Sequence, residues 1–248
     1  MAVFDRPSLR SSRKTLLATQ LVLDLPFEDG DRLEDFLRSP ANAVALDAVL
    51  AWPVWPAPAL LVWGPTGSGR THLARIWARC SGARLLDGGR LGAAPALLAG
   101  LADARHCVID DADRVQDDVT LFHLYNMIAG RGGQLLLTAS RPLGDWGLVL
   151  PDLISRLRTA WSCRIGQPDD ALLEALLVKQ LQDRQLIVLP GVVSYLVRHM
   201  ERSFAAVRRL VRELDRASLR ARRPITLPLA RQVLAVETSG STTSSPDL

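Results

Sequence analysis

The sequence predicts an α/β fold in which a parallel sheet carries helices on both faces and a small all-helical domain follows. Short apolar runs within 59–64, 106–113 and 134–140 alternate with stretches of helical periodicity at 70–80 and 120–130. Runs of this kind are typical of strands that are buried on both faces of a parallel sheet. From Pro168 onward the apolar runs disappear and helical spacing continues alone, which predicts the second domain.

Changes in composition divide the chain into five segments. Residues 1–19 contain four basic residues among serines and few apolar residues, so we expect a flexible basic arm. Residues 20–27 form a short separate segment, 28–167 the sheet domain and 168–236 the helical domain. The serine- and threonine-rich stretch 237–248 predicts a disordered tail.

Positive charge gathers in the helical domain. The whole chain of 248 residues has a formal net charge of only +4, and its hydrophobic content of 48% is enough for a sizeable core. Between Arg198 and Arg223, however, nine arginines stand against three acidic residues, a local net charge of +6. This region is suited to phosphates or to an acidic partner.

The cysteines and the apolar runs predict a cytoplasmic protein. Cys80, Cys107 and Cys163 are far apart and form no C-x-x-C pair, so we expect buried, reduced thiols. No run of about 18 uncharged apolar residues occurs, and the N-terminal region lacks an apolar signal core, so neither membrane insertion nor export is expected.

The stretch GPTGSGRT predicts a phosphate-binding loop between a strand and a helix. It follows the apolar run 59–63 and differs at one position from G-x-x-x-x-G-K-[ST], in which backbone N–H groups and a lysine hold phosphates and the final hydroxyl holds magnesium. A glycine-rich turn without a ligand is the alternative. The candidate residues are Gly64, Pro65, Thr66, Gly67, Ser68, Gly69, Arg70 and Thr71.

Two further strands end in polar residues that favour the phosphate-binding interpretation. Cys107–Asp111 is apolar until it reaches Asp110 and Asp111, which is typical of a magnesium-holding aspartate and a neighbour that orients water. A solvated acidic turn is the alternative. At the end of the run 134–140, Thr138 and Ser140 could face a terminal phosphate or simply cap the strand.

The order and spacing of these motifs resemble a known family. GPTGSGRTHLARIWA, VIDDADRV, LFHLYN, LLLTASRPL, LPDLISRL and ELDRASLRARRPITLPLARQVL are similar to the AAA+ module of the bacterial replication initiator DnaA, and more closely to its short paralogues of the Hda type, the regulatory inactivators of DnaA. The resemblance covers roughly residues 20–236. It implies a P-loop AAA+ α/β domain followed by a helical lid domain.

The resemblance also implies a role for each motif. The loop is Walker A, Asp110 and Asp111 belong to Walker B, and Ser140 lies in the sensor 1 segment. Thr71 and Asp110 would hold magnesium beside ADP or ATP. Arg156 matches the arginine finger, which acts in trans, although a surface arginine often has no such role. Arg208 is the best match to sensor 2, with Arg209 and Arg212 as alternatives.

The segment 20–27 resembles the sliding-clamp-binding motif of Hda proteins. Gln20 begins it, Leu21, Leu23 and Leu25 alternate as in an extended strand, and Pro26 and Phe27 end it. Such a peptide can place an amide and alternate apolar side chains in pockets of another protein. An edge strand on the chain's own domain is the alternative.

Two departures from the initiator pattern shape the expected function. Only about a dozen polar residues follow Val236, so no sequence-specific DNA binding is expected, and Arg70 replaces the Walker A lysine. Because a planar guanidinium is a poor substitute for a compact ammonium, we expect weakened nucleotide binding and little turnover. The resemblance implies a regulator that binds the DNA-loaded sliding clamp and promotes hydrolysis of DnaA-bound ATP. An active AAA+ ATPase that loads or remodels replication machinery and a nucleic-acid binder using the basic lid are the alternatives, and the oligomeric state stays open.

Overall fold

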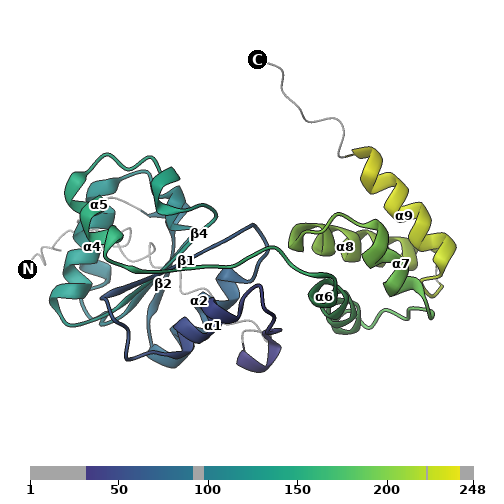
Figure 1. Ribbon diagram of the computed structural model, residues 1–248, viewed down its shortest axis with the longest axis horizontal. Coiled ribbons are helices and arrows are strands. Elements are labelled where there is room, and N and C mark those ends of the chain that lie inside the picture. The colour runs from purple at the N-terminus through teal and green to yellow at the C-terminus, as the bar shows by residue number, and fades with distance from the viewer. Residues whose placement is uncertain (1–31, 92–97, 222, 241–248) are drawn as a thin grey trace, which may run out of the picture.

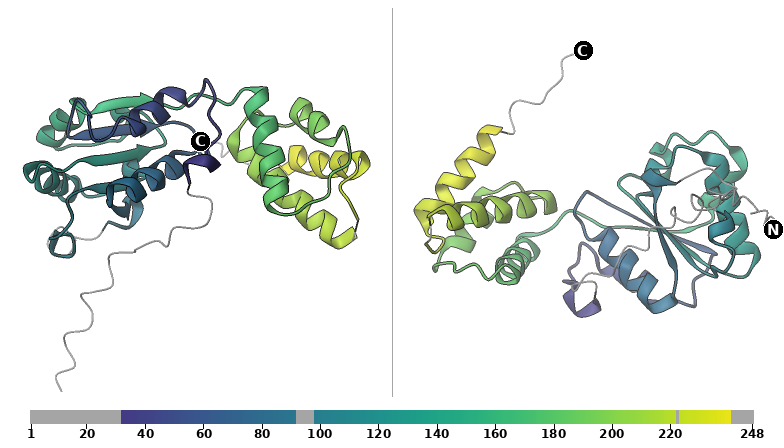
Figure 2. Two further views of the ribbon diagram at one scale, coloured as in Figure 1. Left: turned by 90° about the horizontal axis from the view of Figure 1, so that it is seen from below. Right: turned by 180° about the vertical axis from the view of Figure 1, so that it is seen from behind.

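The protein folds into a sheet domain and a helical domain that lie side by side. The computed structural model describes residues 32–91, 98–221 and 223–240. Figures 1 and 2 show the helical domain as a separate group at one end of the sheet domain, reached through the segment between β5 (Trp161–Arg164) and α6 (Asp170–Asp183). Helix α6 begins where the sequence changes from apolar runs to helical spacing.

The sheet contains five parallel strands in the order β2-β3-β4-β1-β5. Its remaining strands are β1 (Ala59–Trp63), β2 (Arg84–Asp87), β3 (Cys107–Asp110) and β4 (Leu135–Ala139). Strand β4 lies between β1 and β3, and Val62 pairs in register with Thr138. The carboxyl ends of β1, β3 and β4 therefore meet at one edge, where the loop after β1 begins.

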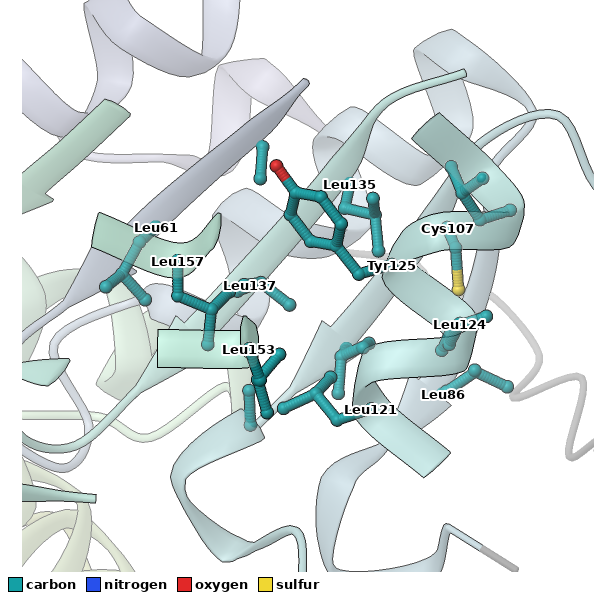
Figure 3. Close-up of a cluster of buried hydrophobic side chains, with 14 of the residues drawn as sticks. Leu61, Leu86, Cys107, Leu121, Leu124, Tyr125, Leu135, Leu137, Leu153 and Leu157 are labelled. Atoms are coloured by element: carbon teal, nitrogen blue, oxygen red, sulfur yellow. The ribbon is translucent and has the colours of Figure 1, made fainter. Parts of the chain in front are cut away.

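Alternate residues of the strands enter two cores on opposite faces of the sheet. On one face Leu61, Ile109 and Leu137 pack against α4 (Asp118–Gly130) and α5 (Pro151–Arg158), as the close-up in Figure 3 shows for part of this cluster. Their neighbours in sequence enter the other core, which contains α1 (Ala43–Leu50) and α2 (Arg70–Ser81). Burial on both faces explains why the runs are apolar without alternation.

Aspartate side chains cap the amino ends of helices α4 and α6. The Asp117 carboxylate accepts a hydrogen bond from the N–H of Val119 at the start of α4, and Asp169 accepts one from Leu172 at the start of α6. Pro151 occupies the first turn of α5, where a missing N–H costs nothing. Short 3-10 turns η1 (Leu33–Asp35), η2 (Gly88–Arg90), η3 (Ala112–Arg114) and η4 (Leu143–Asp145) complete the sheet domain.

The second domain is a four-helix unit with its own core. Helices α6, α7 (Val192–His199), α8 (Phe204–Ala221) and α9 (Leu227–Gly240) enclose a cluster of aliphatic side chains that includes Leu177, Leu196, Leu210 and Leu214. Helix α8 buries one face and presents its arginines on the other, so its composition satisfies both the core and the solvent. Helix α9 continues to Gly240, four residues into the stretch expected to be a tail.

The structure corrects the expectation that all three cysteines are buried. Cys107 and Cys163 are buried and free, as expected, but Cys80 is exposed at the end of α2. Strands β2 and β5 and helix α1 were not predicted from the apolar runs, because the two strands are short and only partly buried. Among the described residues, no helix has both the length and the apolar character to cross a membrane.

Candidate functional site

The GPTGSGRT stretch forms the turn between β1 and the amino end of α2, as the sequence predicts. Gly67 and Gly69 have φ values of +83° and +93°, in the left-handed region that favours glycine. Gly69 is the N-cap of the twelve-residue helix α2, and the side chains of Ser68 and Arg70 are almost completely buried. This arrangement directs the amino end of α2 toward the space above the loop, where an anion is favoured.

Two hydroxyl groups, one from strand β4 and one from the start of α2, converge on Asp110. Thr71 Oγ1 donates to Asp110 Oδ2 at 2.8 Å, and Thr138 Oγ1 donates to Asp110 Oδ1. Thr138 also accepts a hydrogen bond of 2.8 Å from the N–H of Asp111. The predicted pair Thr71 and Asp110 is thus brought together, and Thr138, which the sequence placed only near the strand end, connects β4 to Walker B.

Arg70 turns toward Asp111. Its Nη1 atom lies 3.4 Å from Asp111 Oδ1, with 8% of the Arg70 side chain exposed, and Arg114 lies 3.8 Å from the other oxygen. Burial raises the pKa of Asp111 and the charge of Asp110 raises it further, while Arg70 opposes both effects. Asp111 adopts a left-handed backbone with φ of +54°. The arginine that replaces the Walker A lysine therefore has an acidic partner within the chain.

The helical domain closes over the loop. A Cβ atom placed on Gly67 would lie 3.0 Å from Cβ of Phe204 at the start of α8, and one placed on Gly69 would lie 2.9 Å from the ring of Phe36. Between these contacts lies a pocket of about 230 Å³. Its lining comes from the loop, the η1 region, α6 and α8: Asp35, Phe36, Leu37, Asn42, Gly67, Ser68, Gly69, His72, Leu172, Leu176, Lys179, Gln180, Asp183, Phe204 and Arg208.

One arginine of α8 lines this pocket. Arg208 is exposed and shares the pocket with the loop, whereas Arg209 pairs with Glu201 at 3.2 Å and Arg212 lies outside the pocket. The contacts thus place Arg208, and neither alternative, where a group in the helical domain could reach a ligand on the loop.

An ion pair joins the two domains beside the same pocket. Lys179 of α6 donates to Asp35 of η1 at 2.8 Å. Hydrogen bonding to Lys179 holds the pKa of Asp35 below its usual value, and the same contact raises the pKa of Lys179. No feature of the sequence predicts this pair, because its partners are far apart along the chain.

Ser140 is held by an acidic residue that the sequence analysis did not single out. The Ser140 hydroxyl and backbone N–H both donate to Oδ2 of Asp113, which is buried, and Arg141 Nε lies 3.5 Å from the same oxygen. The hydroxyl that contacts Walker B is thus that of Thr138, while Ser140 is tied to the turn that follows it. The VIDDAD motif contains Asp113, but spacing alone could not distinguish it from a solvated acid.

Arg156 belongs to the opposite side of the sheet from α2. It is exposed on α5, whose Leu153 and Leu157 are buried, and its guanidinium carbon lies 5.5 Å from the ring centre of Phe122 and 5.8 Å from that of Tyr125. Arg156 does not line the pocket beside the loop of its own chain. The predicted segment 20–27 lies outside the described residues.

The residues of the loop suit a phosphate group and a magnesium ion. Ser68 Oγ is buried without a hydrogen-bond partner, and buried Arg70 Nη1 has the 3.4 Å ion pair with Asp111 but no hydrogen bond. Burial of this kind is costly for a polar atom unless a ligand is bound. The hydroxyl of Thr71 and the carboxylate of Asp110 are oxygen ligands of the kind that magnesium prefers.

Comparison with known proteins identifies the helical domain. Residues 169–234 match the family model described as Hda, lid domain. These residues are similar to the lid domain of Hda proteins. The match covers α6, α7, α8 and most of α9, which include the helix that contacts Gly67.

Most of the chain shares its fold with DnaA and RuvB proteins. It matches domain III of DnaA from Thermotoga maritima with a TM-score of 0.72 and 18% identity, covering 85% of this chain and 98% of that one. It matches AMPPCP-bound DnaA from Aquifex aeolicus with a TM-score of 0.62 and 17% identity, over 75% of this chain and 65% of that one. It also matches the RuvB Holliday junction branch migration motor of Thermotoga maritima. That match has a TM-score of 0.65 and 16% identity, and covers 83% of this chain and 72% of that one. Together with the match of residues 169–234 to the Hda lid-domain model, these similarities confirm the predicted AAA+ fold and the resemblance to an Hda-like DnaA paralogue.

Proposed function

We propose that this chain is a negative regulator of chromosomal replication initiation, which binds the DNA-loaded sliding clamp and promotes hydrolysis of ATP bound to DnaA. The match of residues 169–234 to the Hda lid domain is the observation that carries the proposal. The DnaA-like fold of the chain supports it.

The loop and the lid would hold an adenine nucleotide as a structural ligand. DnaA structures with AMPPCP share this fold, and the pocket joins the loop to η1, α6 and α8. Gly67, Gly69 and the amino end of α2 would bind phosphate, and Arg208 would reach it from the lid. Thr71 and Asp110 would hold magnesium, which neutralises phosphate charge when it is bound. The bound ligand would thereby stabilise the contact between the two domains.

The chain's own turnover is expected to be weak or absent. Asp111 is the residue that would orient an attacking water, and Arg70 lies 3.4 Å from its carboxylate. Turned toward Asp111, the planar guanidinium of Arg70 is also a poor substitute for the compact ammonium that contacts the phosphates. This pairing argues against the alternative of an active loader or remodeller.

Arg156 would supply the catalytic charge to the nucleotide of DnaA. In phosphoryl transfer, negative charge spreads over the γ-phosphate oxygens, and an arginine from a neighbouring protein stabilises that charge. Exposure of Arg156, together with its position away from its own loop, leaves its guanidinium accessible to another protein. The segment 20–27 would anchor the chain to the clamp.

The proposal is tested by measuring hydrolysis of ATP pre-bound to DnaA, with clamp loaded on DNA and this chain added with and without ADP. We expect hydrolysis to accelerate only when clamp, DNA and this chain are all present. Hydrolysis by the isolated chain at a comparable rate would instead support an active ATPase. Acceleration without clamp, accompanied by strong salt-sensitive DNA binding, would support direct nucleic-acid binding through the lid.

The arginine in the loop gives a separate prediction. Arg70→Lys should bind ADP more tightly, by about fivefold or more and thus by about 1 kcal/mol, because the compact ammonium reaches the phosphates without the planar group. Isothermal titration of ADP into both proteins measures the change. Arg90→Lys, an exposed substitution on η2, is the matched control and should leave the affinity unaltered. Weaker binding by Arg70→Lys would show that the loop is adapted to arginine.

A further inference from the structure

A groove runs between α8 and α9 on the lid, separate from the pocket at the loop. Its volume is about 780 Å³. Leu229, Val233 and Val236 of α9 and Ala217 of α8 provide an aliphatic floor, and Val236 is 70% exposed. Between its arginines, α8 contributes the small side chains of Ala217 and Ala221 to the lining.

The rim of this groove is basic. The rim contains Arg209, Arg216, Arg220 and Arg223, and Glu213 is the one acidic residue among the described side chains that line the groove. Glu213 already accepts a hydrogen bond of 2.7 Å from Arg216. Within the part of the chain that the structure describes, Arg220 and Arg223 form no ion pair. Arg220 and Arg223 therefore place positive charge beside the exposed side chain of Val236 and the aliphatic residues beneath it.

This combination selects one kind of occupant. An aliphatic floor gains from burying leucine-like side chains, and the arginines favour carboxylates through paired hydrogen bonds. A nucleic acid would satisfy the arginines but not the floor, and the described lining of the groove contains no aromatic ring on which a base could stack. A helix with aliphatic residues on one face and acidic residues beside them satisfies both.

The groove is also free of the other proposed contacts. Figure 1 shows α9 at one end of the molecule and α4 and α5 at the other. Arg156 lies on α5, and its guanidinium contacts Phe122 of α4. A partner seated between α8 and α9 would leave both Arg156 and the pocket at the loop accessible. We propose that this groove binds an acidic amphipathic helix of a partner protein, a third contact beyond those to the clamp and to DnaA.

The test uses a fluorescein-labelled synthetic helix of 18 residues with leucines on one face and glutamates flanking them. Its binding to the full chain is followed by fluorescence anisotropy, beside a matched peptide with lysines for glutamates and an oligo-dT of equal length. We expect the acidic helix to bind, the lysine helix not to bind, and the oligo-dT to bind at least about tenfold more weakly. Arg220→Glu with Arg223→Glu, and separately Val236→Asp, should each weaken the acidic helix about tenfold or more.

Arg212→Glu is the matched control, because Arg212 lies on α8 outside the groove. It should change the affinity by less than about twofold, and thermal unfolding should confirm that every variant is folded. If Arg212→Glu weakened binding of the acidic helix as much as the groove variants do, the effect would be general charge attraction and the proposal would be overturned. Tighter binding of oligo-dT, lost in the Arg220 and Arg223 variant, would assign the groove to nucleic acid instead.

Discussion

Arg156→Ala is expected to abolish stimulation of DnaA-bound ATP hydrolysis while the variant still folds and still binds the clamp. An arginine supplied from a neighbouring protein raises phosphoryl-transfer rates by about 10³-fold or more in GTPases, so its loss should return hydrolysis to the unstimulated rate. The side chain is exposed and Leu153 and Leu157 hold α5 in the core, so the free energy of unfolding should fall by less than about 1 kcal/mol.

The measurement is single-turnover hydrolysis of ATP pre-bound to DnaA, with clamp on DNA and each variant added in excess. Arg158→Ala serves as the control, because Arg158 is exposed on the same helix and should retain stimulation. Arg156→Lys should rescue little, since an ammonium lacks the planar fork. Full stimulation by Arg156→Ala would eliminate the trans-arginine mechanism even if both partners bind.

Replacing Gln20 and Leu21 with alanine is expected to remove clamp binding. An amide and an apolar anchor of a short docking peptide commonly contribute most of its affinity, so the double variant should bind at least about tenfold more weakly, equivalent to about 1.4 kcal/mol. Both residues precede the described sheet domain, so its thermal unfolding should not change.

Surface plasmon resonance on immobilised clamp measures this effect. Arg10→Ala with Arg13→Ala, within the basic stretch upstream, provides a control that separates the docking motif from general charge attraction. The same double variant of Gln20 and Leu21 should also fail to stimulate hydrolysis of ATP bound to DnaA, although its Arg156 is intact. Clamp affinity equal to the wild type would exclude the segment 20–27 as the docking motif.

The sequence motifs predict the fold more completely than they predict the candidate site. Because β1, β3 and β4 are buried on both faces, their residues need not alternate between apolar and polar, and the strands are visible in the sequence as apolar runs. Helical spacing of apolar residues predicts the lid domain in the same way. Edge strands β2 and β5 lie partly in solvent and contain Arg84 and Arg164, which hides them from the same criterion. The phosphate-binding loop was predictable because its glycines and its hydroxyl are local requirements of the turn and the helix end.

By itself, the sequence determined the buried strands β1, β3 and β4, the polar residues at their ends and the helical character of the second domain, because burial and backbone geometry act over a few neighbouring positions. Only the tertiary structure decided which of those residues meet. The parallel order places β4 between β1 and β3, so Thr138 reaches Asp110 and the N–H of Asp111. Packing of the lid on Gly67 leaves Arg208 in the pocket and directs Arg209 to Glu201. These contacts depend on how the chain folds back over long separations, and residue spacing does not encode that.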